Sequence, residues 1–136
     1  VSKMAALQSQ SNSNVTSFVQ SAGLAAIKIP RESITRMVDI FRHRRDYCLS
    51  RLERLSGDLS YTVPQGAFYL FVNLTRFLSG KKMTDLEFCR ELLEKQLVGL
   101  VPGSAFGKEK FVRLSYATGD DNLKKAFDRI EEYLNG

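Results

Sequence analysis

Two cysteines and one histidine are the side chains of this sequence that most readily carry covalent or metal chemistry. Cys48 and Cys89 each fall within an apolar helical pattern, without the close spacing or the histidine partners of a metal site. His43 lies beside arginines, so we expect it to be solvated and not to join a Ser-His-Asp triad within this chain. We therefore predict no metal site and two buried, reduced thiols, which are typical of a cytoplasmic protein.

An arginine in a predicted strand is the strongest candidate for binding an anion. Alternation along the segment 111–116 gives two faces, one with Val112, Leu114 and Tyr116 and the other with Phe111, Arg113 and Ser115. A guanidinium among apolar neighbours needs an anionic partner, because burying it unpaired is costly. On the residues alone, a structural ion pair with an acid on a neighbouring element is the more common explanation for such an arginine.

Three further segments have residue types that suit tight backbone geometry. The serine- and asparagine-rich run 11–17 is typical of a helix cap and a turn. The run 64–66, Pro-Gln-Gly, is typical of a turn before an apolar strand. The segment 101–107 contains two glycines in a loop that offers backbone N–H groups, but no predicted helix starts beside it. We interpret these three segments first as structural.

The positive charge of the chain is concentrated between Lys28 and Arg54. The formal net charge is +5, and this stretch holds eight basic residues and four acidic ones. The acids are interleaved with the bases, and no set of aromatic residues for base stacking accompanies them. The pattern favours a solvated helix face, so we expect no nucleic-acid partner.

The length and hydropathy are those of an ordinary globular domain. The chain has 136 residues, of which 43% are hydrophobic and 26% charged. It contains no apolar stretch of the roughly 18 to 20 residues that a membrane span requires, and residues 8–16 are polar where a signal peptide would be apolar. We expect a cytoplasmic protein with no membrane partner.

Hydrophobic periodicity predicts an α+β fold. The period of 3.6 residues predicts helices over 1–10, from a cap at Asn14 or Thr16 to about residue 28, from Pro30 to Gly57, over 84–96, and over a final segment from Leu123 to Leu134. Alternating or short apolar runs predict strands over 59–63, 67–72, 97–101 and 111–116. We expect a small mixed or antiparallel sheet of about four short strands, packed with helices and preceded by a long connecting helix.

Five phrases of the sequence together resemble a known family. They are Gln8 to Ser17, Phe41 with Arg44-Arg45-Asp46, Pro64 to Tyr69, Val101 to Gly107, and Arg113-Leu114-Ser115-Tyr116-Ala117. In this order and at compatible spacing they resemble the carboxyl-terminal portion of the pyridoxal-phosphate-dependent aminotransferases of fold type I, most like the prokaryotic-type aspartate aminotransferases. The resemblance extends from Lys3 to the end of the chain.

The resemblance implies a domain organisation and a set of site residues. Residues 1–29 would form a helical segment and interface loop at the edge of a large domain, and residues 30–136 the carboxyl-terminal small domain. In the family, the arginine that matches Arg113 binds the substrate's α-carboxylate. The Ser-Asn segment lies at the interface of a homodimer, which makes Ser13 and Asn14 candidates for contacting the partner subunit's pyridoxal phosphate.

The catalytic lysine of the family has no counterpart here. Lys3 follows a serine, as the Schiff-base lysine does, but it precedes Ser13 by only ten residues and lacks the Gly-x-Arg that should follow. The aspartate that holds the pyridine nitrogen also lies upstream of the part that this chain resembles. We therefore expect a fragment with no catalytic residue of its own, which alone neither binds the cofactor nor transaminates.

Two functions remain open on the sequence. The first is transfer of an amino group between an amino acid and a 2-oxo acid by the full-length protein, with aspartate as the default substrate and aromatic amino acids or prephenate as alternatives. The second is a non-catalytic α+β binding module that uses the basic helix 30–56.

Overall fold

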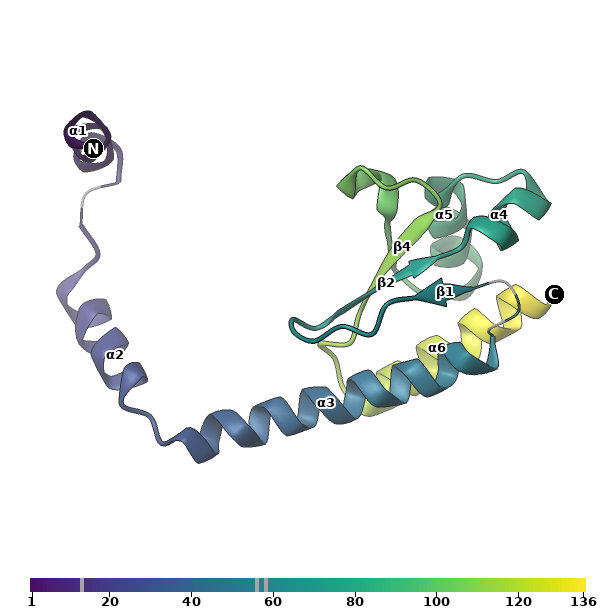
Figure 1. Cartoon of the computed structure of the whole chain (residues 1–136), viewed down its shortest axis with the longest axis horizontal. Coiled ribbons are helices and arrows are strands. Elements are labelled where there is room, and N and C mark those ends of the chain that lie inside the picture. The colour runs from purple at the N-terminus through teal and green to yellow at the C-terminus, as the bar shows by residue number, and fades with distance from the viewer. Residues whose placement is uncertain (13, 56, 58) are drawn as a thin grey trace. The chain divides into compact units, whose positions relative to one another are not determined.

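The computed structural model describes residues 1–12, 14–55, 57 and 59–136 (Figure 1). The chain divides into two compact units, Val1–Met37 and Val38–Gly136. The predicted division of the parent protein at residues 29 and 30 concerns its relation to a large domain and stays a prediction.

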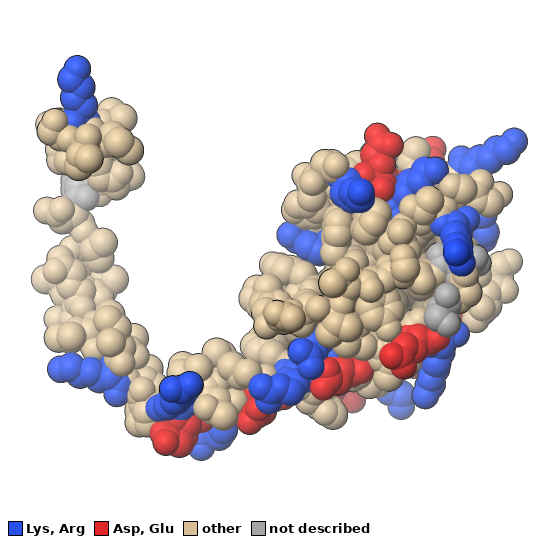
Figure 2. Space-filling model, in the orientation of Figure 1, with Lys and Arg blue, Asp and Glu red and all other residues tan. Residues whose placement is uncertain are grey.

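The described residues of the first unit form helices with no buried side chain. It contains α1 (Ser2–Ser11), α2 (Ser17–Ile27) and the first turns of α3 (Arg31–Arg54), which begins directly after Pro30 as expected for a proline at a helix start. α2 has no charged residue, and Figure 2 shows its surface in tan. Phe18 on this helix is 73% exposed. No apolar side chain of α2 is therefore buried by another part of the described chain.

The second unit is built on a small antiparallel sheet. Its described strands are β1 (Ser60–Tyr61), β2 (Tyr69–Asn73), β3 (Val101–Pro102) and β4 (Phe111–Ser115), in the order β1-β2-β4-β3. Each pair of neighbours is antiparallel. With the helices described below, this confirms the predicted α+β class and the hairpin of β1 and β2.

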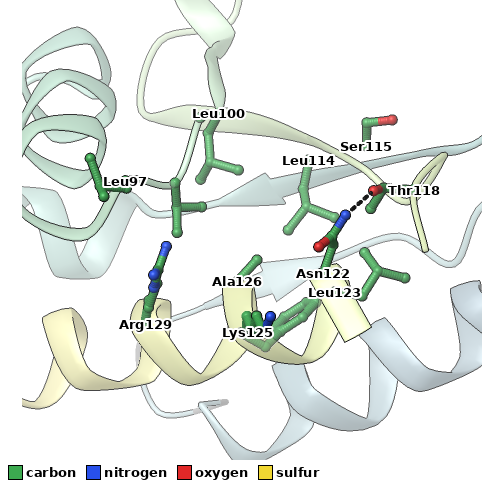
Figure 3. Close-up of a pocket in the computed structure, with 13 residues that line it drawn as sticks. Leu97, Leu100, Leu114, Ser115, Thr118, Asn122, Leu123, Lys125, Ala126 and Arg129 are labelled. Carbon is green, nitrogen blue, oxygen red and sulfur yellow. Dashed lines mark hydrogen bonds between the residues drawn. The ribbon is translucent and has the colours of Figure 1, made fainter. Parts of the chain in front are cut away.

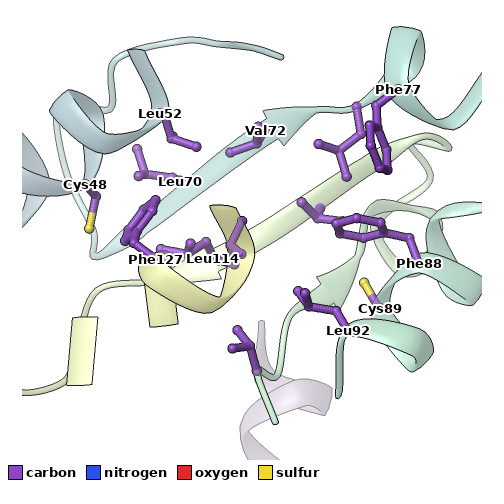
Figure 4. Packing of buried hydrophobic residues seen from close by; sticks show 14 of the residues in the cluster. Cys48, Leu52, Leu70, Val72, Phe77, Phe88, Cys89, Leu92, Leu114 and Phe127 are labelled. Carbon is purple, nitrogen blue, oxygen red and sulfur yellow. The ribbon is translucent and has the colours of Figure 1, made fainter. Parts of the chain in front are cut away.

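One face of the sheet is buried beneath the helices α3, α4 (Thr75–Lys81), α5 (Asp85–Gln96) and α6 (Asp120–Asn135). Figure 4 shows the core between them, to which all four helices and both long strands contribute. In β4, Val112 and Leu114 point into this core while Arg113 lies on the opposite face, as the alternation predicted. The fully buried side chains include Cys48, Leu70, Leu74, Leu78, Phe88, Leu92 and Phe127.

Two expectations about the elements are wrong. The segment 97–101 is not a strand along its length, because Leu97 adopts a left-handed φ of 55° at the end of α5 and only Val101 joins the sheet. Helix α4 was not predicted, although Phe77 and Leu78 bury its inner face. Asn73, two residues before the first residue of the helix, accepts hydrogen bonds from the backbone N–H and the hydroxyl of Thr75.

Two local predictions, one for the start of α5 and one for the cysteines, are confirmed. Thr84 and Glu87 form the predicted capping box at the start of α5. Cys48 and Cys89 are buried free thiols. Among the described residues, no group of histidine, cysteine, aspartate and glutamate is suited to holding a metal ion. None of the described helices is long and apolar enough to cross a bilayer.

Candidate functional site

Arg113 lies near the middle of the sheet face that the helices leave open. Its strand β4 is flanked by β2 and β3, and Arg113 pairs in register with Phe71 on one side and Val101 on the other. The side chain is half-buried. The carbon at the centre of its guanidinium lies 4.3 Å from the ring centroid of Tyr69 and 4.5 Å from that of Phe106. Two aromatic rings therefore hold the cation in place.

The structural ion pair that is common for such an arginine is not formed with any described residue. Within the described ranges, no carboxylate lies within salt-bridge distance of Arg113 and no hydrogen bond leaves its guanidinium. Stacking uses the faces of a guanidinium, whereas its N–H donors point outward in the plane. Arg113 therefore lies close to two rings with its N–H donors unused by any described residue, and such donors suit a carboxylate.

Arg51 provides an internal comparison, because it is an arginine with a purely structural environment. Its side chain is 8% exposed, and its guanidinium bonds Asp128 at 2.7 Å and Glu131 at 2.6 Å. It also donates to the hydroxyl of Tyr47. The hydrogen bond to Glu131 is the main cause of a raised pKa for Arg51. Three N–H donors of Arg51 are thus engaged by neighbouring side chains, whereas no described residue accepts a hydrogen bond from the guanidinium of Arg113.

The ring of Phe106 reaches Arg113 from the 3-10 helix η1 (Gly103–Phe106), between β3 and β4. Gly103 is indispensable to this turn, because a Cβ there would lie 2.3 Å from the carbonyl oxygen of Lys108 and 2.6 Å from the Cβ of Phe111. Gly107 ends the turn with a φ of 74°. Gly103 thus allows a close backbone approach and Gly107 supplies a left-handed φ, which supports the structural interpretation of that loop.

A buried carboxylate ties this loop to the start of α5. Asp85 accepts a hydrogen bond of 2.7 Å from the backbone N–H of Ser104. Burial alone would raise the pKa of Asp85, but hydrogen bonds from the backbone N–H and hydroxyl of Ser104 and from the backbone of Lys110 outweigh it and lower that pKa. Sequence reasoning gave Asp85 no role. Its signal was present, because Asp85 precedes Phe88, Cys89 and Leu92 at the spacing of the buried face.

Other parts of the five phrases also converge on β4. Tyr116 donates from its hydroxyl to the carbonyl of Ala67 at 3.0 Å and from its backbone N–H to Phe68 at 2.9 Å. The ring of Phe41 packs between them, 6.0 Å from Phe68 and 6.4 Å from Tyr116. Arg45 reaches the carbonyl of Pro64 at 3.4 Å. Residues of the second and third family motifs, around Phe41 and Pro64, thus pack against the end of β4 that follows Arg113.

The candidates for cofactor contact lie in the first unit. Ser13 is outside the described residues. Asn14 is exposed, between α1 and α2. Lys3 is exposed on α1, as expected of a surface lysine.

A hollow of about 310 Å³ in the second unit is distinct from the Arg113 surface. Figure 3 shows it between α6 and the segment 97–100, with Leu114 in its lining and Asn122 donating to Thr118. Because Leu114 and Arg113 follow each other in β4, their side chains lie on opposite faces of the sheet. The hollow therefore does not extend the anion site.

The arginines of the second half of α3 are largely paired. Arg42 contacts Asp39, Arg44 bonds Asp120 at 2.8 Å, and Arg45 contacts Asp46. Figure 2 shows blue and red side chains intermixed along this helix. This pairing is what the interleaved sequence predicted, and it lowers the charge available to a polyanion.

Comparison with known proteins assigns the chain to a family. The family model for aminotransferase class I and II matches residues 1–130. An aspartate aminotransferase of Rhizobium meliloti (strain 1021) is 41% identical over 136 residues, which cover 96% of this chain and 33% of that protein. The chain belongs to the class I and II aminotransferases, and it spans about a third of the length of the relatives it matches.

Solved structures agree in fold. The aspartate aminotransferase structure from Rhizobium meliloti has a TM-score of 0.89 at 39% identity, covering 97% of this chain and 34% of that one. The structure of an aromatic aminotransferase from Pyrococcus horikoshii has a TM-score of 0.87 at 33% identity, covering 98% of this chain and 35% of that one.

The family implies pyridoxal phosphate as cofactor, and the described residues do not form a complete site for it. Such a site needs a lysine for the Schiff base, an acid at the ring nitrogen and a set of phosphate ligands. Lys3, the lysine whose context most resembles the required one, is exposed on a helix with no buried residue. The Arg113 surface instead offers a cation whose donors suit a carboxylate.

Proposed function

We propose that the full-length protein is a cytoplasmic, homodimeric aminotransferase in which Arg113 binds the α-carboxylate of the amino-acid or 2-oxo-acid substrate. One observation carries the proposal within this chain. The guanidinium of Arg113 is half-buried, is fixed between Tyr69 and Phe106, and has no carboxylate partner among the described residues. Membership of the aminotransferase family supplies the class of substrate that would bring that carboxylate.

The proposed task of Arg113 is orientation. Two parallel N–H donors of a guanidinium match the two oxygens of a carboxylate, so the substrate is held in one plane. A lysine ammonium is a point charge and would leave the substrate free to rotate. Pyridoxal phosphate, if held by other parts of the full-length protein, would supply the electron sink for bond cleavage at Cα. Holding the carboxylate fixes the Cα–H bond for that cleavage.

Aspartate is the proposed amino donor, with an aromatic amino acid or prephenate as the alternative. The relative from Rhizobium meliloti is named an aspartate aminotransferase, and the structure from Pyrococcus horikoshii is of an aromatic aminotransferase. In this proposal Arg113 binds the α-carboxylate, which all these substrates share. The preference for one substrate side chain over another must therefore come from other residues.

In the same proposal, the first unit serves the dimer. Ser13 and Asn14 would reach the cofactor of the partner subunit, and residues 1–29 would adjoin a large domain. The exposed, charge-free surface of α2 supports a covered position in the full-length protein. The chain 1–136 alone would then lack both the cofactor-binding lysine and the cover for this helix, and would be inactive.

An assay of the full-length protein tests the function. We expect amino transfer from aspartate to 2-oxoglutarate, or from an aromatic donor, in the presence of pyridoxal phosphate. The chain 1–136 is the matched control, and we expect it to show neither transfer nor protein-bound imine absorbance. Absence of transfer with every donor tested would contradict the proposal for the full-length protein. A stoichiometric imine on the chain alone, abolished by Lys3→Ala, would overturn the assignment of Lys3.

The same preparation tests the alternative of a binding module. Salt-dependent binding of DNA or RNA by the second unit would favour it. The ion pairs of Arg42, Arg44 and Arg45 speak against such binding.

A further inference from the structure

Asp85 is a charged side chain in a position where the fold expects an apolar one. It is 4% exposed and lies on the buried face of α5, one turn before Phe88 and Cys89. A buried carboxylate is tolerated only where it is well hydrogen-bonded. The capping of α5 does not require it, because Thr84 and Glu87 already form the capping box. The carboxylate of Asp85 is therefore directed to something other than its own helix start.

The partners of Asp85 lie in the loop between β3 and β4. The backbone N–H of Ser104, the second residue of η1, donates to its Oδ2 atom at 2.7 Å. Ser104 lies near the start of this loop, so the carboxylate of Asp85 anchors the loop where η1 begins.

The far side of the same loop carries the ring that stacks on Arg113. Phe106 is the last residue of η1, and its ring centroid is 4.5 Å from the guanidinium carbon. The same ring packs edge-on against Phe71 at 6.3 Å. Since η1 is only four residues long, a shift of Ser104 moves Phe106 with it. The contact between the Phe106 ring and Arg113 therefore depends on the hydrogen bond that holds Ser104.

We propose that Asp85 is a positioning residue for the substrate carboxylate site: by holding the N–H of Ser104 it sets η1, and thereby the Phe106 ring that fixes the donor fork of Arg113. This inference rests on the proposed role of Arg113. It adds that the orientation of the fork is set from α5 on the helical side of the sheet, by a residue that touches neither substrate nor cofactor. A misplacement of about 1 Å in such a fork can lower the rate on the order of 100-fold.

The test is a double-mutant cycle in the full-length enzyme loaded with pyridoxal phosphate. The single variants are Asp85→Ala and Arg113→Lys, and the third is their combination. If Asp85 acts through Arg113, we expect Asp85→Ala to lower kcat/KM about 10- to 100-fold in the wild type and less than about 3-fold in the Arg113→Lys background. The absorbance of the bound cofactor should be the same in all variants. Asp85→Asn keeps an oxygen that can accept from Ser104 and should recover most of the loss.

Two controls separate positioning from stability. Asp128→Ala removes an acid that bonds Arg51, away from the loop, and we expect it to lower the melting temperature without changing kcat/KM. If Asp85→Ala does not fold, Phe106→Leu tests the contact between the ring and Arg113 directly. We expect its loss of kcat/KM to shrink in the Arg113→Lys background in the same way.

Each outcome bears on a different claim. Equal losses from Asp85→Ala in both backgrounds would show an effect independent of Arg113 and would overturn the inference while leaving the proposed function intact. A near-normal kcat/KM for Arg113→Lys alone would overturn both the role of Arg113 and the inference that depends on it. A loss that Asp85→Asn does not recover would also count against the hydrogen bond to Ser104 as the cause.

Discussion

At the scale of single residues, Arg51 and Arg113 differ because their surroundings differ. Arg51 is enclosed by Asp128, Glu131 and Tyr47, which satisfy its donors from several directions. Arg113 lies close to two aromatic rings, and its donors meet no acid within the described chain. The first arrangement stabilises the fold, and the second leaves a cation free for the anion that we propose it binds.

Replacing Arg51 should therefore affect stability and spare catalysis. Arg51→Met keeps much of the apolar stem but removes three charge-assisted or polar hydrogen bonds. Asp128 is partly exposed and regains water, so we expect a loss of about 1 to 3 kcal/mol in the free energy of unfolding. Denaturant titration measures it. A stability equal to that of the wild type would mean that this network contributes nothing.

The two cysteines should be chemically silent in the folded protein. Burial raises the pKa of Cys48 to about 12, and burial together with the charge of Asp85 raises that of Cys89 to about 12. The ordinary value is 9.0, so the unfolded chain ionises first as the pH rises. The stability from these neutral thiols is complete below pH 9 and decreases between about pH 9 and 12.

A thiol reagent at pH 8 gives the corresponding measurement. We expect both cysteines to react only at the rate at which the protein unfolds, and rapidly in denaturant. Cys48→Ala and Cys89→Ala assign the signal to each residue. Rapid labelling of either thiol in native buffer would contradict its enclosure in the core.

At the scale of elements, the sequence predicted what depends on neighbouring residues and missed what depends on distant ones. The capping box of Thr84 and Glu87 and the alternation in 111–116 are local patterns, and both are confirmed. Leu97 has the residue type of a strand, but it closes α5 in a left-handed conformation while Val98 is buried in the core. The tertiary packing of Val98 thus overrides the local propensity of Leu97.

The sequence also predicted only part of the candidate site. Arg113 was identified from its face of the strand and from the family resemblance. The contact between Phe106 and Arg113 could not be predicted, because Phe106 reaches Arg113 through a turn whose direction depends on the hydrogen bond between Asp85 and Ser104. No spacing rule links residues 85, 104 and 113.

The turn that carries Phe106 should be intolerant of any side chain at its first position. In Gly103→Ala the new Cβ would overlap the backbone of Lys108 and Phe111, so the loop must shift. We expect a loss of about 1 to 3 kcal/mol in stability, measured by denaturant titration, and a lower kcat/KM in the full-length enzyme. Gly99→Ala is the matched control, since no atom lies within 4 Å of its Cβ position. Equal behaviour of the two variants would contradict the close approach at Gly103.

At the scale of the whole molecule, the chain combines a self-contained unit with one that is incomplete. The unit Val38–Gly136 has its own core beneath its sheet, whereas α1 and α2 bury none of their side chains. The chain also spans only about a third of its relatives. In the proposed full-length dimer, the exposed surface of α2 would be covered and the donors of Arg113 would meet the carboxylate of the substrate.

The central claim is that Arg113 binds the carboxylate that all substrates share. The most direct measurement is kcat/KM of the full-length Arg113→Lys enzyme for aspartate and for an aromatic amino donor. We expect both values to fall by the same factor, about 30- to 1,000-fold, which corresponds to about 2 to 4 kcal/mol of transition-state stabilisation. The melting temperature should stay within about 2 °C of the wild type, because Arg113 makes no ion pair with a described residue. Near-normal values, or a loss for one donor only, would contradict the assignment.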